Sequence, residues 1–326
     1  MILALAGGVG GAKLATGFVR VLSPAELTIV VNTADDFDHL GLHISPDLDT
    51  MMYNLAGIHN PETGWGIAGE TWGFMQALKV LGGETWFQLG DRDLATHIER
   101  TRRLKAGESL SAITQFFCRQ LGIQHRVVPM SEDPVRTIMN TDRGPLAFQN
   151  YFVRLRCEPV VNRIEYDGAD RARLSAGFEA ALNDGQLRGI VICPSNPFLS
   201  IAPILAISGL REKLRSRGVP IIAVSPIVGG QAIKGPAAKL FRELGCEPSA
   251  VEVARYYRGV VDAVVIDEVD HSLAPSITDL GIEPIVTHTI MHNQSDREWL
   301  ARDVVDLSNS LGSGLAGGAG SAPRKV

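Results

Sequence analysis

Two glycine-rich segments of this sequence contain the residue types that hold phosphate groups. The first, Gly7-Gly8-Val9-Gly10-Gly11-Ala12-Lys13, follows a short apolar run and precedes a helical pattern. The second surrounds Gly229-Gly230 and also includes Lys234. Backbone N–H groups at such turns can face a phosphate, and a nearby lysine adds a positive charge. Two such turns on one sheet predict a site for the two ends of a nucleoside diphosphate.

The first turn matches neither of the common nucleotide-binding fingerprints. Ala12 and Leu14 stand where a Walker A loop requires Gly and Ser or Thr. Lys13 stands where the third glycine of G-x-G-x-x-G belongs. A tight turn chosen for close packing of helix against strand is therefore the structural alternative to a phosphate site.

Polar residues follow the second apolar run, at residues 27–31. In NAD-binding units an acidic residue at this point holds the ribose hydroxyls, but here the position is Asn32. Asn32 suits a hydrogen bond to a ribose or a base, and it argues against an NAD-dependent oxidoreductase. Asp35 and Asp36 can ligate a hard cation, although capping or solvation of a loop is the simpler role for each.

Two acidic motifs precede helical patterns. In Ser45-Pro46-Asp47-Leu48-Asp49-Thr50, Asp47 fits a helix N-cap and Asp49 fits the first turn, where the helix dipole stabilises a carboxylate. The functional alternative is a Mg²⁺ site, because carboxylates beside a phosphate loop commonly hold the metal that neutralises a diphosphate. In Gly90-Asp91-Arg92-Asp93, Arg92 is either a salt-bridged surface residue or a fork-shaped donor to a ligand.

A rigid turn follows the apolar run at residues 189–193. The segment Pro194-Ser195-Asn196-Pro197 contains two prolines, and Ser200 follows shortly after it. Its hydroxyl and amide groups would stand at the sheet edge where doubly wound folds bind ligands. An ordinary strand-to-helix loop is the structural alternative.

The elements that must position these motifs alternate between short apolar runs and helical patterns, which predicts an α/β fold with a Rossmann-like parallel sheet and helices on both faces. Residues 1–57 and 171–307 are expected to form this nucleotide-binding core. Residues 58–170 are more charged and amphipathic, which predicts an inserted, mostly helical cap subdomain. The Gly, Ala and Ser composition of residues 308–326 predicts a flexible tail.

The composition excludes several classes of protein. With 45% hydrophobic and 21% charged residues, the 326-residue chain is an ordinary globular protein. A net charge of -5, with no basic stripe interleaved with aromatic residues, disfavours nucleic acid as a partner. No apolar stretch is long enough to cross a membrane, and the four cysteines form no C-x-x-C pair, which suits a cytoplasmic location.

Taken in order, these motifs resemble the 2-phospho-L-lactate transferase family, CofD. The matching segments include the first glycine turn, Val31-Asn32-Thr33-Ala34-Asp35-Asp36, the Ser45-to-Thr50 and Phe87-to-Asp93 segments and Pro194-Ser195-Asn196-Pro197. The resemblance runs from Met1 to about Val305. It implies an enzyme of coenzyme F420 biosynthesis that needs Mg²⁺ and tends to form homodimers. Its implied substrates are the deazaflavin alcohol Fo and a guanosine diphosphate ester of a small acid, and its implied by-product is GMP.

The resemblance also implies roles for individual residues. Asp49, Thr50 and Arg92 match the deazaflavin side, and Asp49 and Lys13 are the expected catalytic residues. The metal is expected at Asp49, with Asp35 and Asp36 as weaker candidates. The expected nucleotide-binding residues are Gly8, Gly10, Gly11, Lys13, Asn32, Ser195, Asn196, Ser200, Gly229 and Gly230. Members of this family transfer lactyl, enolpyruvyl or 3-phosphoglyceryl groups, and the residues leave this choice open. A 3-phosphoglyceryl donor would need an additional basic contact, for which Arg143, Arg154 and Arg156 are candidates. The alternative is a non-catalytic, sugar-nucleotide-binding regulator of the same superfamily, which would share the first glycine turn alone.

Overall fold

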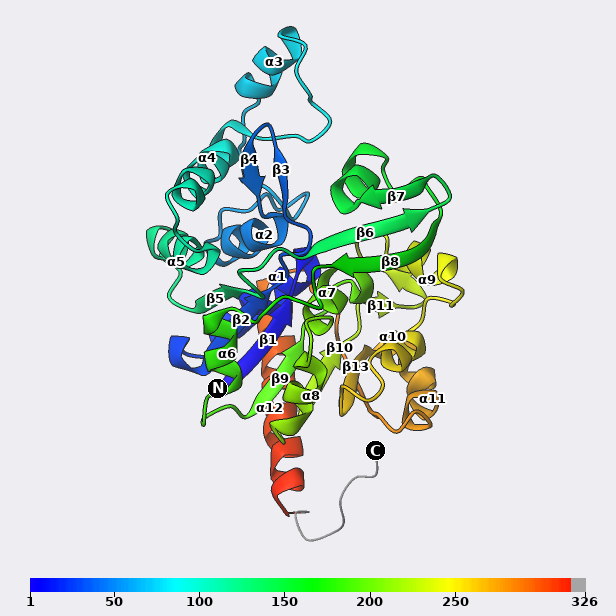
Figure 1. Ribbon diagram of the computed structural model, residues 1–326. Helices are drawn as coiled ribbons and strands as arrows, with labels where there is room; N and C mark the ends of the chain where they lie inside the picture. The colour runs from blue at the N-terminus through cyan, green and yellow to red at the C-terminus, as the bar shows by residue number, and fades with distance from the viewer. Residues whose placement is uncertain (318–326) are drawn as a thin grey trace.

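A seven-stranded parallel sheet forms the centre of the molecule (Figure 1). The structure is a computed structural model that describes residues 1–317. The strands lie in the order β14-β13-β10-β9-β1-β2-β5, so the chain builds outward from β1 in one direction and then from β9 in the other. This is a Rossmann-like arrangement and confirms the predicted fold class. The strands are β1 (Ile2–Ala6), β2 (Leu27–Val31), β5 (Arg126–Pro129), β9 (Gly189–Ile192), β10 (Ile221–Val224), β13 (Ala263–Asp267) and β14 (Glu283–Thr287).

Burial explains why the inner strands form. Every residue of β1, β2, β9, β10 and β13 is buried, because helices cover both faces of the sheet. Along β1, Leu3 and Leu5 point into one apolar core, and Ile2 and Ala4 point into the other. The edge strand β14 is only partly covered.

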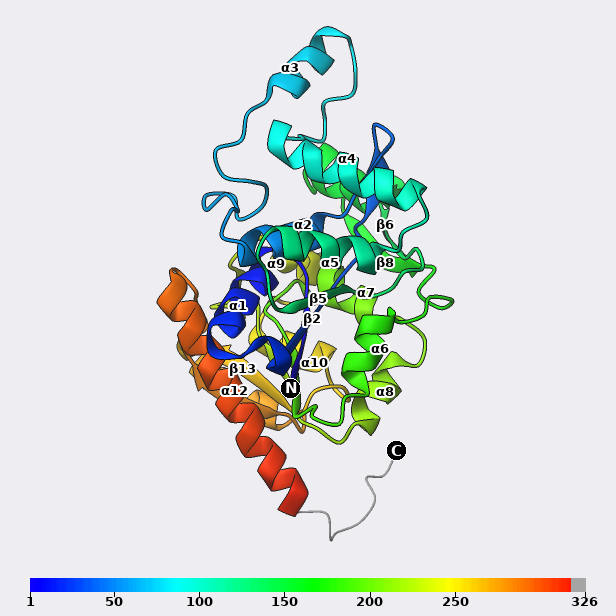
Figure 2. The ribbon, with the colours of Figure 1, turned by 90° about the vertical axis from the view of Figure 1, so that its left-hand side faces the viewer.

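One face of the sheet is covered by α1 (Gly8–Val21) and α12 (Gln294–Gly317), which run side by side (Figure 2). They pack closely because Gly17 has no side chain; a Cβ there would stand 2.1 Å from the carbonyl oxygen of Arg297. The helices on the other face include α6 (Ala176–Leu182), α7 (Ala202–Leu205), α8 (Leu210–Ser216) and α10 (Ala250–Tyr256). Shorter elements complete this part of the chain: η1 (Pro24–Glu26), η3 (Pro197–Ile201), β11 (Ile227–Val228), β12 (Gln231–Ala232), α9 (Ala237–Glu243), η4 (Glu268–Leu273) and α11 (Ala274–Thr278).

The predicted insert at residues 58–170 has a different internal structure from the expected one. Its first part is helical and, with α2 (Pro46–Leu55) and the β3–β4 hairpin (Phe37–His39, Leu42–Ile44), lies above the sheet (Figure 1). Those helices are α3 (Gly73–Val80), α4 (Asp91–Lys105) and α5 (Leu110–Gln120). The second part is not helical: β5 belongs to the central sheet, and the three strands that follow form an antiparallel sheet. These are β6 (Arg136–Thr141), β7 (Gly144–Ala147) and β8 (Val161–Asp167), with η2 (Asn150–Arg154) between β7 and β8.

The C-terminal boundary also differs from the prediction. The last helix continues past residue 308 to Gly317, because Ser308 is fully buried against Gly189 and its hydroxyl donates to the carbonyl oxygen of Arg188. The small side chain of Ser308 therefore allows a close contact between this helix and strand β9. Residues 318–326 of the predicted tail lie outside the described residues. Within the described part of the chain, no helix combines the length and apolar character needed to cross a membrane.

Candidate active site

The main cavity opens at the carboxyl edge of the sheet, between β1 and β9. It has a volume of about 780 Å³ and lies where the strand order reverses, the usual ligand position in such folds. Gly7 follows β1 directly, Pro194 follows β9 after one residue, and both line it. Nine of the residues predicted for the site also line it: Gly8, Gly10, Lys13, Asp35, Asp49, Thr50, Ser195, Asn196 and Ser200. The glycine turn and the acidic helix start therefore share one space.

The first glycine turn presents the N-terminus of α1 to this cavity. Gly7 is the N-cap residue and has no side chain to cap the helix, while the Asp47 carboxylate accepts from the backbone of Gly8 at the helix start. Gly8, which has a left-handed φ of 61°, begins the helix, and Gly8, Val9 and Gly10 line the cavity. The first N–H groups of a helix have no partner inside the helix, and the helix dipole is positive there. The turn can therefore bind an anion.

The same glycines also serve packing, as the structural alternative proposed. A Cβ at Gly10 would lie 2.1 Å from the carbonyl oxygen of Pro194, and one at Gly11 would lie 2.5 Å from Ser195 Oγ. Gly11 does not line the cavity. Its contact draws the two loops together, so packing and anion binding are compatible properties of one turn.

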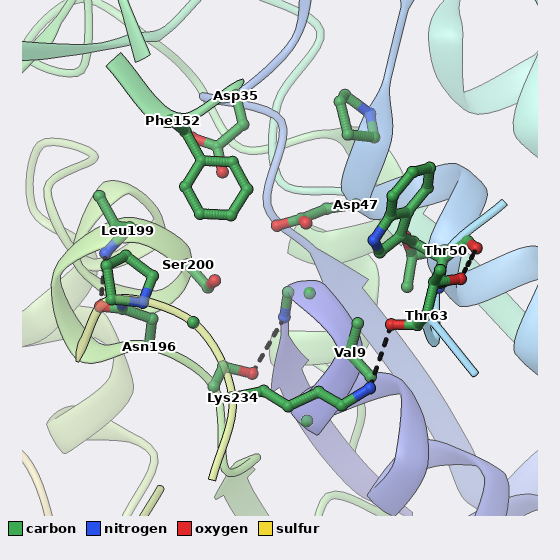
Figure 3. A pocket seen from close by; sticks show the side chains of 18 of the residues that line it. Val9, Asp35, Asp47, Thr50, Thr63, Phe152, Asn196, Leu199, Ser200 and Lys234 are labelled. Carbon is green, nitrogen blue, oxygen red and sulfur yellow. Dashed lines mark hydrogen bonds between the residues drawn. The ribbon is translucent and has the colours of Figure 1, made fainter. Parts of the chain in front are cut away.

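Two lysines stand at the glycine-turn side of the cavity. Lys13 Nζ donates to the carbonyl oxygen of Met291 at 2.9 Å, and burial lowers the pKa of Lys13, as do the charges of Arg297 and Lys234. Lys234 Nζ reaches across Val9 and donates to the carbonyl oxygen of Thr63 at 3.1 Å (Figure 3). Both ammonium groups are held by neutral oxygens, so neither positive charge is neutralised by a carboxylate within ion-pair distance in residues 1–317.

The turn after β9 supplies hydroxyl and amide groups. Ser195 Oγ accepts a hydrogen bond from the Gly7 amide at 3.2 Å, which links this turn to the first one. Asn196 Oδ1 caps η3 by accepting from the amides of Phe198 and Leu199, while its Nδ2 has no partner among the described residues. Ser200 is buried at the cavity wall (Figure 3). The free Asn196 amide is thus a donor available to a ligand.

Asp35 and Asp47 form a pair of buried carboxylates at the cavity (Figure 3). Asp47 Oδ2 accepts from Asn32 Nδ2 at 3.0 Å, and Asp35 Oδ1 accepts from Thr137 Oγ1 at 3.1 Å. Burial raises the pKa of Asp47 to about 6. Burial, followed by the charge of Asp47, raises the pKa of Asp35 well above its usual value. Neither acid has a cationic partner within residues 1–317, so each would gain from a bound cation.

Asp49, only two residues along α2, has the opposite environment. Its carboxylate is held by both terminal nitrogens of Arg100, which is 1% exposed, and its Oδ2 lies 3.7 Å from Nδ1 of His97. Burial raises the pKa of Asp49, while the charges of Arg100 and His97 oppose the shift. Asp49 is therefore a charge-paired wall residue with lone pairs left for a ligand.

Helix α4 presents a row of polar side chains to the same wall. Asp93 and His97 line the cavity, and His97 Nε2 lies 3.2 Å from Asp93 Oδ2. Tyr53 donates its hydroxyl to Asp93 Oδ1 at 2.6 Å. Although burial raises the pKa of Asp93, the interactions with His97 and Tyr53 lower it more. Two carboxylates, one guanidinium and one imidazole thus form one buried network with Tyr53.

Aromatic rings form the remaining walls. Trp86 and Phe87 line the cavity and pack edge to face with a centroid separation of 5.8 Å. Phe148 and Phe152 face it from the antiparallel-sheet side and stack at 5.2 Å with an interplanar angle of 17°. These walls suit a flat aromatic ligand. Trp65 also lines the cavity, whereas Trp72 does not.

Several predicted site residues lie outside the cavity lining. Asn32 is fully buried and orients Asp47. Asp36 lines a separate, smaller cavity and accepts from Ser45 Oγ at 2.9 Å. Arg92 is exposed at the start of α4, where it donates to the carbonyl oxygen of Ala68 at 2.6 Å.

The second glycine turn is also outside the lining. Gly229 and Gly230 form the left-handed turn of the β11–β12 hairpin, with φ values of 56° and 74°. The Gly229 amide is already used, because it donates to the carboxylate of Asp270 at 3.1 Å. The flanking residues Ser225 and Lys234 line the cavity instead.

Sequence reasoning missed the α4 residues and underrated Asp47. Asp93, His97 and Arg100 are spaced four and three residues apart, which places them on one face of a helix. That spacing was a usable signal. Asp47 was interpreted as an N-cap, yet Ser45 is the cap residue and Asp47 faces the cavity from the first turn.

Comparisons with known proteins agree with this arrangement. Residues 2–297 match the sequence model of the family described as 2-phospho-L-lactate transferase CofD. The chain is 39% identical over 316 residues to phosphoenolpyruvate transferase of Streptomyces griseus, an alignment that covers 95% of this chain and 99% of that protein. It is 38% identical over 304 residues to 2-phospho-L-lactate transferase of Methanosarcina mazei, covering 93% and 99%. The crystal structure of a UPF0052 family member from Bacillus halodurans covers 93% of this chain and 98% of its own, with a TM-score of 0.59 and 12% identity, which is a likeness of fold alone.

Proposed function

Because the chain belongs to the CofD family of 2-phospho-L-lactate transferases, we propose that it transfers a phospho-acid group from a guanosine diphosphate ester to the ribityl hydroxyl of the deazaflavin Fo, in coenzyme F420 biosynthesis. GMP is released. The observation that carries this proposal is a single cavity that joins a glycine-rich helix N-terminus, two buried carboxylates without a cationic partner and two aromatic walls. These are the parts needed for a diphosphate, a cation and a flat alcohol.

The donor binds on the glycine-turn side. The amide of Gly10 and the ammonium of Lys13 face the diphosphate, and charge that builds on the leaving phosphate is stabilised there. The Asn196 amide and the Ser200 hydroxyl offer hydrogen bonds to the rest of the nucleotide. Lys234 adds a second positive charge at the same side.

Asp35 and Asp47 fit a Mg²⁺ ion. Residues 1–317 contain no group of three acidic, histidine or cysteine side chains arranged to hold a metal. Magnesium commonly binds through one or two carboxylates and takes its remaining ligands from water and substrate phosphates. The raised pKa values of these two buried acids mean that a cation would relieve their repulsion. When bound, the ion would neutralise the diphosphate.

This proposal places the metal at Asp47, two residues before Asp49, where it was expected from the sequence. Asp49 already has Arg100 as a counter-charge, and Asp36 lies in another cavity. Asp35 is the one expected ligand that keeps its role in the proposal. Asp49 is left for the acceptor.

The acceptor alcohol binds against the aromatic and α4 walls. The deazaflavin ring lies among Trp86, Phe87 and Phe152, and Asp49 accepts a hydrogen bond from the ribityl hydroxyl, with Thr50 beside it. Burial raises the pKa of Asp49, which increases its affinity for a proton, so this carboxylate is suited to take the hydroxyl proton. The hydroxyl oxygen then bonds to the phosphorus next to the acid, and the bond from that phosphorus to GMP breaks.

The test is direct. Purified protein is incubated with Mg²⁺, Fo and each of three guanosine diphosphate esters, carrying lactate, enolpyruvate or 3-phosphoglycerate. Mass spectrometry is expected to find a phosphorylated deazaflavin and GMP with at least one ester. Absence of product with all three would reject the transferase proposal in favour of a nucleotide-binding regulator.

A further inference from the structure

Arg156 is a cavity-lining cation whose guanidinium has no assigned partner. It follows η2, between β7 and β8, and lines the main cavity. None of the residues 1–317 forms a hydrogen bond or ion pair with its guanidinium. The two lysines of the cavity both donate to carbonyl oxygens. Arg156 is also exposed, so its donor fork is open both to solvent and to a ligand in the cavity.

The backbone at this position is strained in a way that the fold maintains. Arg156 and Cys157 adopt left-handed φ values of 49° and 58°, which side chains other than glycine rarely adopt. The loop is fixed by amide hydrogen bonds from Leu155 to the Asn150 carbonyl and from Cys157 to the Tyr151 carbonyl, at 2.8 and 2.9 Å. Strained residues of this kind cluster at ligand sites. A glycine here would relieve the strain but would lose the guanidinium.

The wall that carries Arg156 adjoins the proposed metal pair. Gln149 Nε2 donates to the backbone carbonyl of Asp35 at 3.1 Å, and both Phe152 and Asp35 line the cavity (Figure 3). The other two arginines considered from the sequence do not line the cavity. Arg143 pairs with Glu158 at 3.8 Å, and the Arg154 guanidinium carbon lies 5.9 Å from the ring centroid of Trp86.

The charges of the cavity determine what kind of group Arg156 can receive. Asp35, Asp47, Asp49 and Asp93 all line it, so an anionic acid would be repelled without its own cation. The lysines stand at the glycine turn, beside the diphosphate in the proposed function. A planar guanidinium pairs with a carboxylate through two parallel hydrogen bonds.

We propose that Arg156 forms the subsite for the carboxylate of the acid carried by the donor ester. This subsite rests on the proposed function for the identity of the donor. It places the acid between the antiparallel-sheet wall and the Asp35–Asp47 pair, on the far side of the reacting phosphorus from the guanosine. The second phosphate of the 3-phosphoglyceryl ester is also an anion that a guanidinium could bind. Because all three esters carry a carboxylate and only this one carries the extra phosphate, comparing them shows which group Arg156 binds.

The test measures binding without the acceptor, so it does not depend on turnover. Calorimetry in Mg²⁺ compares GDP with the lactyl, enolpyruvyl and 3-phosphoglyceryl esters for the wild type, Arg156→Gly, Arg156→Lys and Arg143→Ala. Arg156→Gly is expected to weaken ester binding by about 10- to 100-fold, the usual effect of losing a charge-assisted pair. GDP binding should change by less than about twofold. The glycine variant should melt no lower than wild type, because the left-handed strain is removed.

The remaining variants define the outcome. Arg156→Lys keeps the charge without the fork and should show a smaller loss, and Arg143→Ala, at an exposed position outside the cavity, should match wild type. Equal weakening of GDP and all esters by Arg156→Gly, or no weakening of any ester, would overturn the subsite. A loss confined to the 3-phosphoglyceryl ester would also overturn it, because the group bound would then be the second phosphate. If the wild type binds esters in this pattern but forms no product with Fo, the proposed function fails and the subsite stands.

Discussion

The two acidic pairs of the cavity differ in what surrounds them. Asp35 and Asp47 have neutral partners such as Thr137 and Asn32, and their pKa values are raised. Asp49 and Asp93 lie in a network with Arg100 and His97. Asp47 and Asp49 are two residues apart on one helix turn, yet one lacks a counter-charge and the other has a bidentate one.

The contrast shows how a fold assigns different tasks to similar residues. A buried carboxylate without a cation is costly, and it persists where a ligand completes it. A buried carboxylate with a guanidinium is structurally complete and can still accept one more hydrogen bond. The first pair is suited to a metal and the second to a substrate hydroxyl.

The largest effect is expected when the Asp49–Asp93 network loses the guanidinium of Arg100. Arg100→Met should reduce the free energy of unfolding by about 3 to 5 kcal/mol, because Asp49 is left buried without a counter-charge. Urea denaturation at pH 7.5 measures this. Adding Asp49→Asn to the same chain should restore part of the loss. The control Arg102→Met, on the exposed side of α4, should move the midpoint little.

Substitution in the Asp35–Asp47 pair should lower activity without lowering stability. Asp47→Asn is expected to lower turnover by about 10² to 10³-fold, the range for loss of a charge-stabilising group, while the protein becomes no less stable at pH 8. Initial rates over a Mg²⁺ titration and a thermal melt measure the two quantities. Turnover near that of wild type would return Asp47 to a structural role. A large loss of stability would show that the charged carboxylate already stabilises the fold without a bound cation.

The pH dependence of stability sharpens the same contrast. The pKa of Asp47 is about 6 when folded, against about 3.9 in an unfolded chain, so the folded state holds the extra proton between these values. Stability should therefore fall as pH rises from about 4 to about 6, by about 2 to 3 kcal/mol from this group at about 1.4 kcal/mol per pKa unit. Urea midpoints of wild type and Asp47→Asn across pH 4 to 7 test it. Parallel curves for the two proteins would contradict the prediction.

The smallest effect is expected at Arg92, the α4 arginine that the sequence resemblance assigned to the deazaflavin acceptor. Arg92→Ala should change KM for Fo by less than about twofold, because its side chain is exposed and outside the cavity. Steady-state kinetics with the preferred donor measures this. A tenfold rise in KM would mean that the start of α4 reaches the acceptor and that the two acidic pairs do not divide the substrates as described.

Regular features of the fold were predictable because burial leaves a direct mark on sequence. Strands covered on both faces have uninterrupted apolar runs, as in β1 and β2. The strand β5 was missed because it has only four residues, and its first residue, Arg126, is exposed. The β6 strand alternates buried and half-buried residues, a weaker pattern that did not stand out within a segment expected to be mostly helical. The helical continuation past Ser308 depended on a contact with Gly189, nearly 120 residues away, which composition could not indicate.

The sequence by itself determined the parallel sheet, the glycine-rich turn after the first strand and the set of acidic residues near it, because these depend on local backbone geometry and on hydrophobic periodicity. Tertiary structure alone decided which acids are paired, since Arg100 reaches Asp49 across 51 positions of chain. It also decided that Arg156, rather than Arg143 or Arg154, lines the cavity without a partner. The energy of a buried charge depends on which groups surround it in space, and that arrangement exists only once the distant segments have packed together.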